Sequence, residues 1–121
     1  MKPTDLKQRT KQFAMDVIAF TETLPKDEAS RVLGRQLLRS GTSVGANYRS
    51  AKRAKSNADF IAKMSIVEEE ADESAFWLEL FVGSGKVALA KAEALTREAN
   101  ELVAISVASI NTARRNSTSA R

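Results

Sequence analysis

Apolar residues recur along the chain at alternating intervals of three and four, which is the spacing of one buried face on an α-helix. Four stretches carry this pattern, and none shows the strict alternation of a β-strand. The first predicted helix covers about 4–23, with Thr4 as its N-cap, and it would bury Leu6, Thr10, Phe13, Val17 and Phe20. The second covers about 27–55 and would bury Leu33, Leu37, Ser40, Val44, Asn47, Ala51 and Ala54.

The third and fourth predicted helices cover about 58–82 and 87–113. The third would bury Phe60, Met64, Val67, Ala71, Ser74, Leu78 and Phe81. The fourth would bury Leu95, Ala99, Leu102, Val103, Ser106 and Ile110. Four helices with short connections predict an all-α fold, an antiparallel up-down-up-down four-helix bundle over residues 1–113. Residues 114–121 hold no apolar side chain larger than alanine, so we expect a flexible basic tail there.

The second predicted helix contains the sequence Gly41-Thr42-Ser43-Val44-Gly45, which matches the G-x-S-x-G motif of serine hydrolases. That motif requires a strand-to-helix turn and a histidine base. The flanks here are helical, and the buried stripe keeps its phase across both glycines. We therefore interpret the tract as part of one long helix, with small residues where two helices approach closely.

The composition excludes most common enzyme sites. The chain of 121 residues has no His and no Cys, so it lacks the groups for a Ser-His-Asp triad, a Cys-His pair or a thiolate zinc site. Five acidic residues, Glu68, Glu69, Glu70, Asp72 and Glu73, fan around a helix and cannot converge on one metal ion. Gly83-Ser84-Gly85-Lys86 lacks the spacing of a phosphate-binding loop. We expect no catalysis, no cofactor and no small-molecule substrate.

The net charge is +4, and its clustering carries more information than its size. At about 100° per residue, five arginines of the second helix fall in a sector about 80° wide, opposite the buried stripe. They are Arg31, Arg35, Arg39, Arg49 and Arg53, and Lys52 widens the basic surface. One hypothesis is that this surface follows a phosphate backbone of RNA or DNA. The alternative is ion pairing with acidic residues of the third helix or of a neighbouring subunit.

The third helix carries a second apolar stripe besides its buried one. Its members are Ala62, Ile66, Phe76, Trp77 and Leu80, interleaved with Glu69 and Glu73. A helix in an isolated bundle needs only one buried face, and exposed aromatic residues beside charges are typical of subunit interfaces. The sequence therefore predicts self-association through Ile66, Glu69, Glu73, Phe76, Trp77 and Leu80.

Three segments together resemble the bacterial four helix bundle protein family, which is also called the 23S rRNA intervening-sequence protein family. The segments are 39–49 (RSGTSVGANYR), 58–64 (ADFIAKM) and 70–80 (EADESAFWLEL). The resemblance extends from Phe13 to about Arg114. Ser50 departs from the family pattern, since many members have Glu there, and so does the acidic triple at 68–70.

The resemblance implies a left-handed bundle that assembles into a homopentameric ring without known enzymatic activity. Some members of the family are encoded within insertions in 23S rRNA genes, which implies an association with RNA. A related protein, the accessory variability determinant of diversity-generating retroelements, is a basic pentamer that partners a reverse transcriptase and nucleic acid. The first ten residues are polar, and no apolar run approaches the about 20 residues that span a bilayer, so we expect a cytoplasmic protein without a membrane partner.

Overall fold

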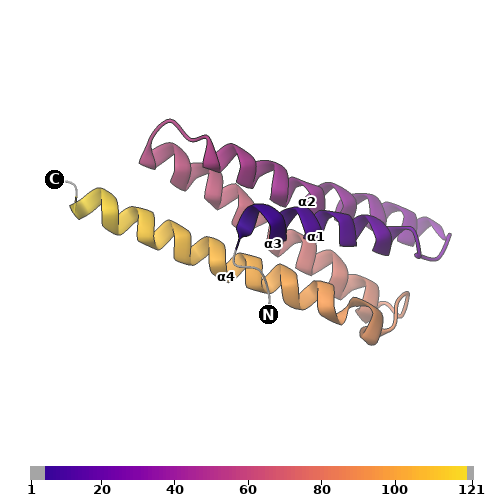
Figure 1. The fold of residues 1–121 in the computed structure, drawn as a ribbon. Helices are drawn as coiled ribbons and strands as arrows, with labels where there is room; N and C mark the ends of the chain where they lie inside the picture. The colour runs from indigo at the N-terminus through magenta and orange to yellow at the C-terminus, as the bar shows by residue number, and fades with distance from the viewer. Residues whose placement is uncertain (1–4, 120–121) are drawn as a thin grey trace.

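The computed structural model describes residues 5–119, and for Thr118 and Ser119 the backbone alone. The predicted antiparallel four-helix bundle is confirmed, with no strand in the described range. The helices are α1 (Leu6–Thr21), α2 (Glu28–Lys52), α3 (Asn57–Gly83) and α4 (Leu89–Ser119). They run lengthwise beside one another, and α1 covers only part of the bundle's length (Figure 1). None of the described helices combines the length and hydrophobicity needed to cross a membrane.

Side chains that precede each of the first three helices cap their free backbone N–H groups. The predicted cap of α1, Thr4, lies outside the described residues, and Asp5 caps this helix by accepting a hydrogen bond from the Lys7 N–H at 3.0 Å. Asp27 accepts from the Ser30 N–H at 3.0 Å, and Ser56 accepts from the Asp59 N–H at 3.0 Å. These caps explain why the helices begin where they do.

The core lies between the four helices and contains most of the residues that the repeating pattern predicted, but Asn47 and Ala54 are only partly buried and the neighbouring Tyr48 is buried. Thr10, Phe13, Val17, Leu37, Val44, Met64, Val67, Leu78, Phe81 and Leu102 are almost completely buried. The rings of Phe20 and Phe81 meet edge to face, with centroids 5.9 Å apart. Ser40 and Ser74 share a buried hydrogen bond of 2.8 Å between α2 and α3, so the polar members of the stripes are also paired.

The interpretation of the glycine tract as helix is confirmed, since α2 continues without a break through residues 41–45. A Cβ atom on Gly41 would lie 2.8 Å from Val17 Cγ2, and one on Gly45 would lie 3.3 Å from the Thr10 carbonyl oxygen. These separations are shorter than ordinary van der Waals contact. The glycines therefore allow α1 to lie directly against α2.

The end of α4 differs from the sequence prediction. The helix was expected to end at residue 113 and to give way to a tail at 114–121, but it continues to Ser119. No Gly or Pro interrupts it, and the Asn57 side-chain amide of α3 donates to the Ala113 carbonyl at 2.6 Å and also bonds the Ser117 hydroxyl. Residues 120 and 121 lie outside the described range, and flexibility of the tail stays a prediction.

The contribution of the Asp27 cap to stability can be tested by varying the pH. Hydrogen bonds from the Ser30 N–H and hydroxyl, with a smaller contribution from Lys86 at 3.1 Å, lower the pKa of Asp27 to about 2. Because the folded pKa lies below the ordinary 3.8, its stabilising effect is complete above about pH 4 and is lost as the pH falls toward 2. We expect Asp27→Asn, which keeps a capping oxygen, to show a smaller drop in thermal midpoint between pH 4 and pH 2 than the wild type. An equal drop in circular-dichroism melts of both proteins would contradict this assignment.

Candidate nucleic-acid interface and subunit contact

The arginine surface of α2 has a first half, Arg31, Arg35 and Arg39, and a second half, Arg49, Lys52 and Arg53. All six predicted residues are exposed, which is consistent with their place opposite the buried stripe. In the first half, Arg31 forms an ion pair with Glu28, one turn earlier in the same helix. Arg39 bonds carboxylates of α3. Two of the three arginines in this half are therefore neutralised within the chain.

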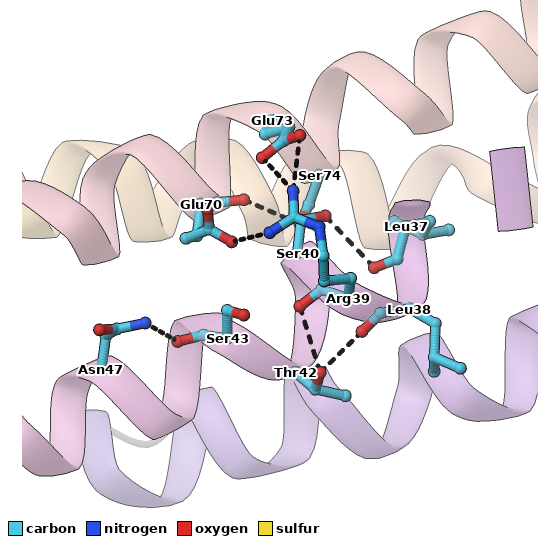
Figure 2. A network of polar contacts seen from close by, with 10 residues as sticks. All are labelled: Leu37, Leu38, Arg39, Ser40, Thr42, Ser43, Asn47, Glu70, Glu73 and Ser74. Carbon is cyan, nitrogen blue, oxygen red and sulfur yellow. Dashed lines mark hydrogen bonds and ion pairs between the residues drawn. The ribbon is translucent and has the colours of Figure 1, made fainter. Parts of the chain in front are cut away.

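The contact of Arg39 is the largest polar link between α2 and α3, and Figure 2 shows its guanidinium pointing to two carboxylates of α3. Its Nη2 atom donates to both oxygens of Glu73, at 2.8 and 2.9 Å, and its Nη1 atom donates to Glu70 at 3.4 Å. The hydrogen bond to Glu73 raises the pKa of Arg39. Burial raises the pKa of Glu70, and the charge of Arg39 acts in the opposite direction. At Arg39 the structure therefore contains an ion pair with α3, as the ion-pair hypothesis expects.

The other cations of the surface have different surroundings. Within residues 5–119, Arg35, Arg49, Lys52 and Arg53 form no ion pair. Three of them lie in the last turn and at the C-cap of α2, where cations also interact favourably with the helix dipole. Exposed cations that form no ion pair within the described residues are the electrostatic feature expected of a surface that contacts phosphate.

The predicted contact face of α3 is partly exposed and partly engaged. Ile66 and Phe76 are 41% and 50% exposed, and Glu69 is exposed between them. Trp77 and Leu80 are half-buried, and the Trp77 ring packs against the core and lies 5.2 Å from the ring of Phe76. Glu73 is bound to Arg39. The freely accessible part of this face is therefore Ile66, Glu69 and Phe76.

A second basic group, which the sequence analysis did not predict, lies between α1 and α4. Arg9 is only 9% exposed. Its Nε and Nη2 atoms donate to the two oxygens of Glu98, at 3.0 and 2.7 Å, and Nη2 also donates to Glu101 at 3.0 Å. These bonds raise the pKa of Arg9 against the opposing effect of burial. The cluster holds α1 against α4 and presents no free cation.

Comparison with known proteins finds one protein family that matches most of the chain. The family model described as 23S rRNA-intervening sequence protein matches residues 2–108. The chain belongs to this family. A crystal structure from the S23 ribosomal protein family of Bacteroides thetaiotaomicron VPI-5482, a protein with unknown function, is 33% identical to it. The two superpose with a TM-score of 0.81 over 87% of this chain and 97% of that one. None of the curated proteins that were compared matches the chain.

Membership in the 23S rRNA-intervening sequence protein family confirms the resemblance seen in the three sequence segments. All three segments lie within the matched range, and they contain the α2–α3 contact described above. The family description refers to an intervening sequence of 23S rRNA. The binding of RNA and the assembly of subunits are therefore the two properties to be argued from its surfaces.

Proposed function

We propose that this protein is a non-enzymatic cytoplasmic scaffold that assembles into a cyclic homo-oligomer and binds structured RNA. The observation that carries the RNA proposal is the group of exposed cations on α2 without a carboxylate partner, Arg35, Arg49, Lys52 and Arg53. Guanidinium groups bind phosphate oxygens in pairs of parallel hydrogen bonds. A ring would repeat this surface, and several weak contacts to one RNA would add up through avidity.

Assembly is supported by the apolar groups exposed on two different faces. On α3 these are Ile66 and Phe76, beside the exposed Glu69. On α2 they are Val32 and Leu38, which lie within a turn of Arg35. A cyclic ring joins one surface of a subunit to a different surface of the next, and these two apolar faces would form the two sides of that contact.

Self-assembly is tested by light scattering during gel filtration. We expect a mass several times 13.2 kDa, and a pentamer would have five times that mass. Phe76→Glu places a carboxylate among those of α3 and should weaken the subunit contact about thirtyfold, as expected for an aromatic residue at the centre of an interface. The control is Leu89→Glu, at a residue that is 60% exposed at the start of α4. A wild-type monomer at micromolar concentration would refute assembly.

RNA binding is tested by charge reversal on the arginine surface. We expect the double variant Arg35→Glu and Arg49→Glu to bind a structured RNA about a hundredfold more weakly at low salt, because it loses and then opposes two phosphate contacts. The slope of affinity against salt should also become shallower. The control reverses two exposed cations of α4, Lys91→Glu with Arg97→Glu, so that the change in net charge is equal.

The alternative function is a protein-interaction hub in which the arginines serve only subunit pairing. The observation in its favour is the pairing of Arg39 with Glu70 and Glu73, since basic and acidic surfaces of α2 and α3 already fit one another within a subunit. Under this alternative the double variant at Arg35 and Arg49 dissociates the ring, and the wild type shows no mobility shift with RNA. Loss of RNA binding from a variant that keeps its oligomeric mass supports the scaffold that binds RNA.

A further inference from the structure

A small groove lies where the start of α1 meets the end of α2. It encloses about 260 Å³, which is below the about 300–1,000 Å³ of pockets for whole drug-sized ligands. Its lining residues are Asp5, Lys7, Tyr48, Arg49, Lys52 and Arg53. The space therefore suits a compact charged group and the atoms next to it.

The lining of this groove has an excess of positive charge. Four of its residues are cations, and none of these forms an ion pair within the described part of the chain. Its one carboxylate, Asp5, is occupied as the N-cap of α1 by the Lys7 N–H. Because α1 starts where α2 ends, the positive end of one helix dipole meets the negative end of the other. The two helix dipoles offset each other at this point, so any attraction for an anion comes from the charged side chains.

Tyr48 supplies an independent observation in the same groove. The residue as a whole is 8% exposed, and its hydroxyl forms no hydrogen bond with any residue between 5 and 119. Within that range the buried side-chain atom without a hydrogen-bond partner is Trp77 Nε1, so the Tyr48 hydroxyl is accessible from the groove and can bond a ligand there. Burial, and secondly the charge of Asp5, raise the pKa of Tyr48, so the phenol keeps its proton at neutral pH and can donate it.

We propose that this groove binds a phosphate group of the RNA, with Arg49, Arg53 and Lys7 providing charge and the Tyr48 hydroxyl donating a hydrogen bond. The proposal rests on the RNA-binding function proposed above and gives it a definite contact point. Phosphate oxygens accept several hydrogen bonds at once, which matches two guanidinium groups beside a phenol. The phosphate could come from the end of an RNA strand or from an internal diester, and both present the same oxygens.

Direct binding can be observed at Tyr48 because it is the only tyrosine in the chain. In the full-length protein labelled with ¹³C-tyrosine, addition of uridine 5′-monophosphate should shift the ring signals, whereas uridine should not. Arg49→Gln should reduce the affinity for the monophosphate about tenfold, as expected for loss of a charged hydrogen bond. The control is Arg97→Gln, which removes an exposed arginine of α4 and should leave the affinity unchanged.

The same variants then test the contact with RNA. Tyr48→Phe removes one oxygen atom from an otherwise buried side chain, and we expect it to weaken RNA binding about tenfold while the helical content is unchanged. Short RNAs with a 5′-phosphate or a 5′-hydroxyl distinguish the source of the phosphate. Tighter binding of the phosphorylated strand identifies a terminal phosphate, and equal binding that falls in Tyr48→Phe identifies an internal one.

The outcomes separate this proposal from the function on which it rests. If RNA binds but Tyr48→Phe and Arg49→Gln bind it as tightly as Arg97→Gln does, the phosphate groove is refuted and the RNA-binding function remains. If the monophosphate shifts the Tyr48 signals but no RNA binds at low salt, the groove binds phosphate, and both the RNA-binding function and RNA as the source of that phosphate are refuted. If the monophosphate and uridine shift the signals equally, phosphate is not the recognised group.

Discussion

Replacing Gly41 with leucine is expected to reduce the free energy of unfolding by about 3 kcal/mol or more. A Cβ atom at this position would lie 2.8 and 2.9 Å from the two methyl carbons of Val17 and 3.1 Å from its Cβ atom. Val17 is fully buried, and a β-branched side chain has few rotamers into which it could move. α2 would have to move away from α1. Removing a glycine from a helix gains about 1 kcal/mol, which would not compensate for this loss of packing.

Urea denaturation followed by circular dichroism measures the effect of Gly41→Leu. The matched comparison is Gly41→Ala against Gly83→Ala, because a Cβ atom on Gly83 has no neighbour within 4 Å. Gly83 is the last residue of α3, so its replacement gains less helix propensity than a replacement inside α2 does. A lower stability of Gly41→Ala than of Gly83→Ala must then come from the contact with Val17, and this is the result we expect. A Gly41→Ala variant more stable than Gly83→Ala would show that α1 and α2 are not in close contact here.

Replacing Arg9 with alanine is expected to cost about 3 kcal/mol, because three charged hydrogen bonds between α1 and α4 are lost together with a largely buried side chain. Arg9 is 9% exposed, and Glu98, which it binds through two hydrogen bonds, is 20% exposed. Arg9→Lys keeps the charge but cannot form the paired hydrogen bonds, so an intermediate loss is expected. Thermal unfolding should show a fall in the midpoint of several degrees for alanine.

The control for Arg9 is Arg97→Ala on the facing helix. Arg97 is 61% exposed and lies 3.9 Å from Glu93, and an exposed pair of this kind contributes about 0–1 kcal/mol. If both alanine variants melt at the same temperature, the cluster between α1 and α4 does not stabilise the bundle. A double variant, Arg9→Ala with Glu98→Ala, should lose less stability than the sum of the two single variants, since both remove the same pair of hydrogen bonds.

The course of the helices could be predicted from the sequence because local signals agree with the fold. Apolar residues keep one phase through each helix, and Pro25 and the Gly83-Ser84-Gly85 turn separate them. The same argument correctly predicted that α2 continues as a helix through Gly41 and Gly45. The end of α4 was less predictable, since the contacts of Asn57 with α4 are made between residues far apart in the sequence.

The polar contacts could be predicted only in part. The arginine surface was identified by its spacing, but spacing alone treats its members as equal, and the neutralisation of Arg39 depends on where α3 lies. Arg9 was not predicted to be buried, because the stripe of the first helix was placed on Leu6, Thr10 and Phe13. A signal was available, since Arg9 is three residues after Leu6 and four before Phe13, which places it at the edge of the buried face.

The shortness of α1 has a consequence for the dynamics of the protein. It has 16 residues and α4 has 31, so the last turns of α4 pack against α3 without α1 beside them (Figure 1). Segments with few buried contacts open locally at a lower free energy than the core does. Amide hydrogens near the end of α4 should therefore exchange with solvent well before those near Leu102. We therefore expect the two ends of the bundle to differ in how readily they open, and the groove lined by Tyr48 and Arg49 lies toward the end that opens more readily.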